Sequence, residues 1–200
     1  LNNIYLGSTI PIDKKLLQKE KIIDVSIEDV VSIITKGEVV GLVQGKAEAG
    51  PRALGNRSLL LDPTLKNAKD TMNNIKKREL FRPFAASVLE DKAKDFFEML
   101  DIDSSPYMMY APEAKELAKK VIPSLVHVDN TCRIQTINKE NNLILYNILK
   151  SFKVPVLMNT SFNLAGYPIV ESFNDILFTL RQSSLKYVYF PDFKKLLIKY

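Results

Sequence analysis

The arginines of this 200-residue chain are few, and most of them lie close together. Six of the 28 basic residues are arginine, and four of these six lie between positions 52 and 82: Arg52, Arg57, Arg78 and Arg82. A guanidinium binds a carboxylate or a phosphate through two parallel hydrogen bonds, which an ammonium cannot do. Local ion pairing would explain such a cluster, but its density favours a site for a phosphate-like anion.

Two of these arginines lie in a glycine-rich segment, residues 44–57, that follows an apolar run. The segment reads QGKAEAGPRALGNR and contains three of the chain's seven glycines. Glycines let a backbone turn tightly and point N–H groups at an anion. The spacing matches neither a Walker A loop nor a GxGxxG motif. The glycines alone fit a plain connecting loop equally well, and Arg52 and Arg57 shift the interpretation to an anion site.

A second candidate is the basic run at residues 75–84, with four basic residues in seven. Such runs are usually a solvated helix end. Because Phe81 and Phe84 flank Arg82, we expect Arg82 to be partly buried and to need an anionic partner. Glu79 would be that partner in a purely structural role, and a bound phosphate would be the functional alternative.

The segment at residues 127–135 contains the single histidine and the single cysteine. His127 alone cannot build a multi-histidine metal site, and a lone histidine is more often structural than catalytic. No base for Cys132 is visible in the sequence, so we expect a buried, inert thiol. Arg133 begins an extended segment and resembles a guanidinium held at a sheet edge.

A fourth polar segment, Asn-Thr-Ser-Phe-Asn at residues 159–163, follows a predicted strand. Ligands of open α/β sheets bind at the carboxyl ends of strands, where these amides and hydroxyls would suit a small polar ligand. An ordinary Asx or Ser turn explains the same letters.

Helical and extended patterns alternate along the chain, which predicts an α/β fold. Several gaps between strands are too short for a parallel crossover, so we expect a mixed sheet. Helices are predicted at residues 26–36, 67–77, 91–100, 113–121, 141–152 and 172–181. Extended segments are predicted at residues 39–43, 58–61, 84–89, 126, 134–137, 154–158 and 187–190.

Composition excludes several classes of protein. With 46% hydrophobic and 26% charged residues the chain is not a disordered tail, and no apolar run approaches the roughly 20 residues of a membrane-spanning helix. One cysteine excludes a disulfide framework and a cysteine-based zinc site, so we expect a cytoplasmic protein. The chain begins without methionine or a signal pattern, and we expect residues 1–25 to be a linker from a missing N-terminal domain and residues 26–200 to be one domain.

Taken in order, the four segments resemble one family, the O-carbamoyltransferases, which include nodulation and antibiotic-tailoring enzymes. The strings are GPRALGNR at 50–57, FRPFA at 81–85, HVD at 127–129 with RIQT at 133–136, and NTSFN at 159–163. The resemblance is to the C-terminal domain of the family and runs from about Gly37 to Tyr189.

The resemblance implies a YrdC-like fold, a twisted mixed sheet with flanking helices in a single domain. It implies a domain that binds ATP and carbamoyl phosphate and forms carbamoyl-adenylate, with Mg²⁺ held mainly by phosphates and no metal ligand from the protein. It further implies a separate N-terminal domain, with an actin-like ATPase fold and a bound metal, that passes the carbamoyl group to a hydroxyl of a small-molecule acceptor.

The resemblance also implies roles for individual residues by their places in the motifs. The catalytic candidates are Lys76, Arg82 and Arg133, and the candidates that bind substrate phosphates or orient the carbamoyl amide are Arg52, Arg57, Asn159 and Ser161. Phosphoryl chemistry of this kind needs fixed cations rather than a nucleophilic side chain.

Two other interpretations stay open at this point. A YrdC-like module that binds RNA or nucleotides without carbamoyl transfer would also be basic, although the net charge of +5 is mild and we expect no nucleic-acid partner and no membrane. A degenerate domain, kept for packing against its N-terminal partner, would fold and bind no nucleotide.

Overall fold

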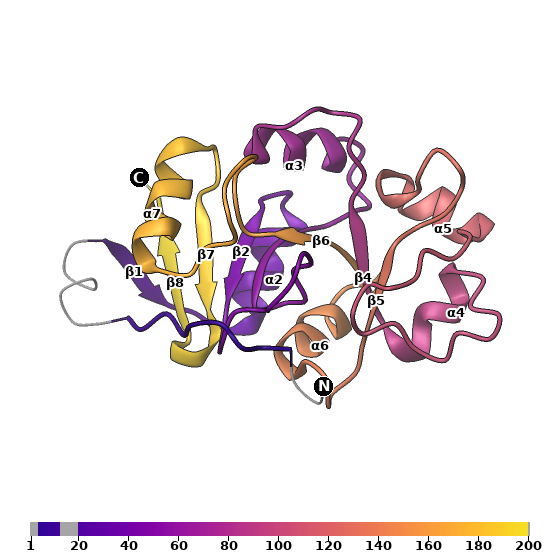
Figure 1. Cartoon of the computed structure of the whole chain (residues 1–200), viewed down its shortest axis with the longest axis horizontal. Coiled ribbons are helices and arrows are strands. Elements are labelled where there is room, and N and C mark those ends of the chain that lie inside the picture. The colour runs from indigo at the N-terminus through magenta and orange to yellow at the C-terminus, as the bar shows by residue number, and fades with distance from the viewer. Residues whose placement is uncertain (1–3, 13–19, 200) are drawn as a thin grey trace.

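Eight strands form one mixed sheet in the order β1-β8-β7-β2-β3-β6-β4-β5 (Figure 1). The computed structural model describes residues 4–12 and 20–199. The β2–β7 and β4–β5 pairs are parallel and the other neighbours are antiparallel, which confirms the predicted mixed sheet. The strands are β1 (Lys21–Asp24), β2 (Val40–Val43), β3 (Arg57–Leu61), β4 (Ala85–Leu89), β5 (Ile134–Ile137), β6 (Val156–Ser161), β7 (Tyr187–Phe190) and β8 (Lys195–Ile198).

Helices pack on both faces of this sheet. They are α2 (Ile27–Thr35), α3 (Ala68–Lys76), α4 (Ala93–Phe96), α5 (Glu116–Val121), α6 (Leu143–Lys150) and α7 (Phe173–Gln182). Residues of α2 and α6 belong to one buried apolar cluster, and residues of α3, α4, α5 and α7 belong to another. None of the helices in residues 4–12 and 20–199 is long and apolar enough to cross a membrane.

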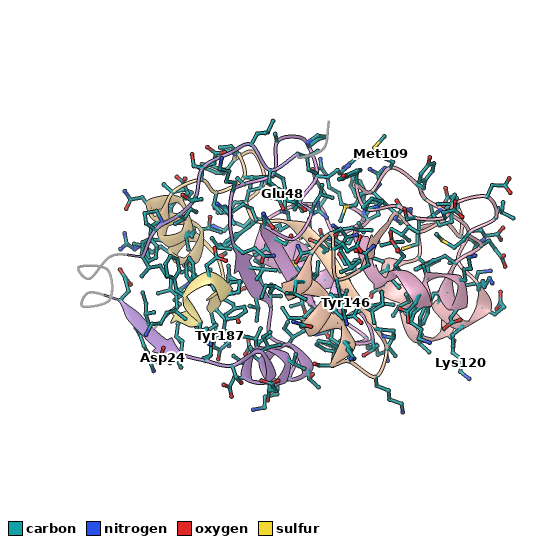
Figure 2. The ribbon with its side chains drawn as sticks, turned by 90° about the horizontal axis from the view of Figure 1, so that it is seen from below. Asp24, Glu48, Met109, Lys120, Tyr146 and Tyr187 are labelled. Atoms are coloured by element: carbon teal, nitrogen blue, oxygen red, sulfur yellow. The ribbon has the colours of Figure 1, made fainter. Side chains whose placement is uncertain are left out.

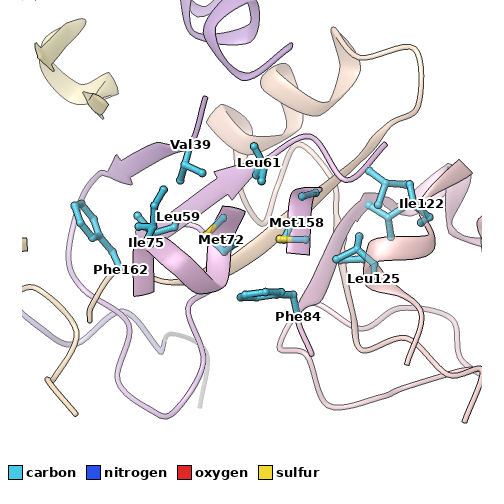
Figure 3. Close-up of a cluster of buried hydrophobic side chains, with 14 of the residues drawn as sticks. Val39, Leu59, Leu61, Met72, Ile75, Phe84, Ile122, Leu125, Met158 and Phe162 are labelled. Carbon is cyan, nitrogen blue, oxygen red and sulfur yellow. The ribbon is translucent and has the colours of Figure 1, made fainter. Parts of the chain in front are cut away.

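The continuous apolar run of β3 shows why the sheet is buried on both faces. Successive side chains of a strand point to opposite faces. Leu59 and Leu61 therefore pack into the cluster of α3 and α7, whereas Leu60 packs into the cluster of α2 and α6. Figure 3 shows Leu59 and Leu61 in the cluster of α3 and α7, together with Met72 and Ile75 of α3. The sheet thus fixes α3, and with it the basic run that follows, against the centre of the molecule.

Two helices begin at capping boxes. Ser26 accepts from the backbone N–H of Asp29, and the Asp29 carboxylate accepts from the backbone N–H of Ser26. Ser172 and Asp175 make the same reciprocal pair at the start of α7. Each box satisfies two N–H groups that have no partner within the helix.

The helix predicted at residues 91–100 is wrong in its second half. Helix α4 ends at Phe96, and Phe97 is extended, fully buried, and paired with Ala114 across an isolated bridge. Phe96 therefore belongs to the helix, whereas Phe97 belongs to the extended segment that follows it. Residue 126, predicted as extended, does have an extended backbone after a 3₁₀ turn, but it belongs to no strand.

Strands β1 and β8 were not predicted from the sequence. They pair antiparallel with each other, Lys21 opposite Ile198 and Asp24 opposite Lys195, at one end of the sheet. β1 lies within the segment expected to be a linker, residues 1–25, of which 1–3 and 13–19 lie outside the described residues. In Figure 2 the β1 residue Asp24 lies near one end of the molecule and Lys120 of α5 near the other.

Candidate functional site

The glycine-rich segment forms an irregular loop between β2 and β3, and a carboxylate holds it together from inside. Glu48 is buried, and its Oε1 accepts from the backbone N–H groups of Leu54, Asn56 and Arg57 at 2.7, 2.7 and 3.1 Å. Residues 4–8 pair with the other side of the loop through backbone hydrogen bonds, including Gly7 N–H to the Ala47 carbonyl at 3.0 Å. The loop that carries Arg52 is therefore fixed by the protein itself.

Arg57, which was expected to bind phosphate, lines neither of the two basic pockets that the other candidate residues line. Its side chain is fully buried, and its guanidinium donates to the carbonyl oxygens of Gln44, Gly45, Asn56 and Ser8. These acceptors occupy both terminal nitrogens, and the buried Nε has no hydrogen-bond partner among the described residues. The structure assigns Arg57 to holding the loop in place.

Three other arginines line a small pocket of about 230 Å³. Arg52 comes from the loop, Arg78 from the segment after α3, and Arg133 from the residue before β5. Burial, and secondly repulsion from Arg133, lower the pKa of Arg52, so the two guanidiniums are close enough to act on each other. Within the described chain no aspartate or glutamate lines this pocket; its other lining residues are Pro51, Ala53, Pro83, Phe84, Ala85, Met108, His127, Asn159, Thr160 and Ser161.

Arg78 is the most firmly positioned of the three. Its Nε donates to Oδ1 of buried Asn73 at 2.6 Å, and one terminal nitrogen donates to the Pro83 carbonyl at 3.2 Å. The guanidinium lies over the Phe84 ring, 4.2 Å from its centroid. Burial, and secondly the charge of Arg82, lower the pKa of Arg78 to about 10. A cation held in this way, with no carboxylate in contact, favours an anionic ligand.

A second pocket, of about 660 Å³, adjoins the first, and Arg78 and Ser161 line both. It lies between the end of α3 and the loop after β6. It is lined by Asn73, Asn74, Lys76, Lys77, Arg78, Glu79, Arg82, Ser161, Asn163, Leu164, Ala165 and Gly166. Four of these residues are cationic, and the single carboxylate among them is that of Glu79.

Lys76 joins α3 to the end of β6 at this second pocket. Its Nζ donates to the Ser161 carbonyl at 2.5 Å and to Oδ1 of Asn163 at 2.9 Å, and it lies 3.1 Å from the Asn163 carbonyl. All of these acceptors are neutral, and the side chain is 3% exposed. Burial, and secondly the charge of Arg78, lower the pKa of Lys76 to about 7. Because its hydrogen-bond partners are neutral, an anion bound nearby would stabilise the charged form of Lys76 and raise its pKa.

Arg82 is exposed rather than partly buried, so that expectation is wrong. The side chain is 52% exposed and its Nε lies 3.1 Å from Oε2 of Glu79, the ion pair expected for a structural role. Phe81, which was expected to cover it, is itself 76% exposed. Arg82 still lines the second pocket.

Asn159 and Ser161 lie at the pockets, as expected for residues at the end of a strand. Asn159 is 1% exposed, and its Oδ1 has no hydrogen-bond partner among the described residues. The Ser161 hydroxyl donates to Oδ1 of Asn163 at 2.6 Å. The structure thus brings Arg52, Arg133, Asn159 and Ser161 to the small pocket and Lys76, Arg82 and Ser161 to the larger one.

His127 and Cys132 have structural surroundings. The His127 ring nitrogens lie 3.1 Å from the Thr131 hydroxyl and 3.3 Å from the Phe84 carbonyl, so the protein occupies both. Cys132 is fully buried, and burial raises the pKa of its thiol to about 12. An inert thiol was expected. The described residues hold no group of three or more histidine, cysteine, aspartate or glutamate side chains that could bind a metal.

Arg78 and Asn163 lie in segments that the sequence singled out, but neither was given a role in the site. Asn163 follows Ser161 by two positions, and the period of two along a strand could have placed it on the same side as Asn159 and Ser161. Arg78 had no such signal, because its contact with Asn73 rather than the local sequence distinguishes it from Arg82.

Comparisons with known proteins show the family of this chain. A family model described as the carbamoyltransferase C-terminus matches residues 31–195. Nodulation protein NolO of Bradyrhizobium diazoefficiens is 42% identical over 158 residues, which cover 76% of this chain and 29% of NolO. Nodulation protein NolNO of Sinorhizobium fredii is 40% identical over 191 residues, covering 90% of this chain and 28% of NolNO. The chain therefore spans less than a third of the length of these relatives.

Solved structures match in fold at low sequence identity. Full-length HypF superposes with a TM-score of 0.60 at 16% identity, over 82% of this chain and 21% of HypF. Sua5 of P. abyssi superposes with a TM-score of 0.53 at 14% identity, over 85% of this chain and 45% of Sua5. With a YrdC-like fold and a family match over most of its length, the chain belongs to the carbamoyltransferase C-terminal family.

Proposed function

We propose that this chain forms carbamoyl-adenylate from carbamoyl phosphate and ATP. The observation that supports it most is the small pocket, where Arg52, Arg78 and Arg133 converge and which no carboxylate of the described chain lines. A small acyl phosphate carrying two negative charges is the chemical complement of such a pocket. The larger, adjoining basic pocket suits a nucleotide triphosphate.

The reaction divides into two phosphate-centred steps. Water cleaves carbamoyl phosphate to carbamate and inorganic phosphate, and a carbamate oxygen then attacks the α-phosphorus of ATP and expels pyrophosphate. Both steps move negative charge among phosphate oxygens, which fixed cations stabilise. Arg78 and Ser161 line both pockets, and in this proposal they contact both reactants. Full-length HypF, which shares the fold, has been solved in a phosphate- and nucleotide-bound form.

Each residue of the site has a role in this proposal. Arg52 and Arg133 bind the phosphate and the carbamate, and Asn159 orients the carbamoyl amide. Lys76 and Asn163 position the nucleotide phosphates, with Arg82 at the outer edge, where a phosphate competes with Glu79.

Mg²⁺ is part of the proposal as the companion of ATP. The larger pocket offers one carboxylate, Glu79, which is already paired with Arg82. This donor set fits an ion held by ATP phosphates and water rather than by a protein cage. Bound there, Mg²⁺ neutralises phosphate charge. Transfer to an acceptor hydroxyl would occur in a further domain of the actin-like ATPase fold, consistent with the greater length of the relatives.

The test is pyrophosphate release by the purified chain with ATP, Mg²⁺ and carbamoyl phosphate, together with mass spectrometry of the nucleotide product. Release that needs all three components, with a carbamoyl-adenylate mass, supports the proposal, and Arg133→Ala should abolish it. The matched control is Arg181→Ala, which replaces an exposed arginine of α7 that lines neither pocket. Tight ATP binding without pyrophosphate release would contradict adenylate formation by this chain.

A further inference from the structure

A buried polar network extends from the small pocket into the sheet. It consists of Ser87 on β4, Gln135 on β5 and Asn159 on β6, which are 0%, 2% and 1% exposed. Gln135 Nε2 donates to the Leu54 carbonyl at 2.9 Å, so one end of the network lies on the arginine-bearing loop. Asn159 at the other end lines the pocket.

The hydrogen bonds of this network have one consistent direction. The Leu54 carbonyl can only accept, so it fixes the Gln135 amide with its nitrogen toward Leu54 and its oxygen toward Asn159. Gln135 Oε1 then accepts from the Ser87 hydroxyl at 2.8 Å and from Asn159 Nδ2 at 3.0 Å. A flipped Asn159 would place its oxygen against that of Gln135, two acceptors facing each other.

The consequence appears at Asn159. Its nitrogen is held by Gln135 and Ser87, and its Oδ1 remains buried without a partner among the described residues. A buried carbonyl oxygen that lacks a donor is costly, and a ligand that supplies one recovers that cost. The small pocket is thus lined by three arginines and by Asn159, an amide of fixed orientation with an unpartnered buried oxygen.

We propose that Gln135, acting through Asn159, makes the small pocket selective for an acyl phosphate that carries an N–H donor. This rests on the proposed function and adds the basis of substrate choice. Carbamoyl phosphate has an amide nitrogen where acetyl phosphate has a methyl group, with the same phosphate and similar size. Asn159 Oδ1 accepts from the amide and is left unpaired by the methyl. Gln135 is the positioning residue, and Asn159 contacts the ligand.

Gln135 rather than Ser87 sets this orientation. A serine hydroxyl serves as donor or acceptor, so Ser87 tolerates either orientation of the Asn159 amide. Without the Gln135 oxygen, the Asn159 amide is free to flip and present its nitrogen to the ligand. Discrimination between N–H and methyl ligands is then lost.

The test compares two stable phosphonates, phosphonoacetamide and acetonylphosphonate, which differ in the same way as carbamoyl and acetyl phosphate. Calorimetry on the full chain gives the ratio of their dissociation constants. We expect wild type to prefer phosphonoacetamide on the order of 10- to 100-fold, the usual effect of leaving a buried polar group unpaired. A merely structural role for Gln135 would change both constants together and leave the ratio unaltered.

Three variants make the comparison specific. Gln135→Met should bring the ratio close to one. Gln135→Glu in its protonated form keeps an oxygen facing Asn159 and an O–H donor facing the Leu54 carbonyl, so it should restore the preference. Thr179→Val removes a buried hydroxyl of α7 that donates to the backbone carbonyl of Asp175. Thr179 belongs neither to this network nor to the lining of the small pocket, so the variant should keep the wild-type ratio. A ratio retained in Gln135→Met would overturn the inference.

Two further outcomes are distinguishable. Equal binding of both phosphonates by wild type overturns the selectivity while leaving the proposed function in place. Binding of neither overturns the proposed function and the inference with it. If Gln135→Met does not fold, NMR of wild type decides, because the Asn159 side-chain NH₂ should exchange slowly with solvent, and rapid exchange contradicts the network.

Discussion

The guanidinium of Arg78 lies 4.2 Å above the ring of Phe84, which connects the basic run after α3 to the first residue before β4. The same guanidinium bonds to Asn73 within α3. A planar cation clamped between a helix and a ring keeps one orientation. Arg78 and Phe84 both line the small pocket, so their stacking fixes one wall of the proposed phosphate site.

Replacing Arg78 with lysine should reduce carbamoyl phosphate-dependent pyrophosphate release by about 100- to 1000-fold, typical of losing one donor to a developing anion. Lysine keeps the charge but not the fork or the stacking on Phe84. Arg181→Lys is the control for the substitution itself. An Arg78→Lys variant of near wild-type rate would show that charge alone, without orientation, is sufficient.

Arg52 and Arg57 share one motif but should behave in opposite ways. Arg57→Met removes a fully buried guanidinium that donates to four carbonyl oxygens and should lower the free energy of unfolding by about 3–5 kcal/mol. Arg52→Ala changes an exposed side chain and should alter stability by less than about 0.5 kcal/mol, while weakening phosphate binding. Urea unfolding and phosphate titration of both variants separate the two effects. A destabilised Arg52→Ala with normal binding would reverse the assignment.

Lys76 should make stability rise with pH. Its pKa is about 7 in the folded chain against an ordinary value of 10.5, so between these pH values the unfolded chain holds a proton that the folded chain has lost. Unfolding then takes up a proton, and the free energy of unfolding gains up to about 1.4 kcal/mol per pH unit from this group. Below pH 7 both states are protonated and the cost of burying the charge is fully present.

Urea unfolding at pH 7, 8 and 9 checks this, with Lys76→Met as the comparison. The variant should lack the part of the slope that belongs to Lys76. Parallel stability curves for the two proteins would contradict a lowered pKa of Lys76.

Local signals in the sequence were sufficient for much of the fold. The pairing of Ser26 with Asp29 marks the start of α2 within a few residues of chain, and the apolar run of β3 reflects burial on both faces. Strand β1 was missed because it pairs only with residues more than 170 positions away, which no local pattern shows. Strand β8 also pairs with β7 across a short turn, Phe190 opposite Lys195, and this local signal was overlooked.

The site was predictable in outline but not in its division of roles. Arg52 and Arg57 have the same neighbours in sequence, and the sequence cannot show that Arg57 points into the interior while Arg52 faces a pocket. Likewise, flanking aromatics suggested burial of Arg82, yet Phe81 points outward and Phe84 packs on Arg78 instead. These distinctions depend on tertiary contacts.

The most direct test of the central claim is exchange of labelled pyrophosphate into ATP by the purified chain, with Mg²⁺, in the presence and absence of carbamoyl phosphate. Reversible formation of carbamoyl-adenylate predicts exchange that requires carbamoyl phosphate, disappears in Arg133→Ala and persists in Arg181→Ala. Exchange independent of carbamoyl phosphate, or none despite ATP binding, would contradict it.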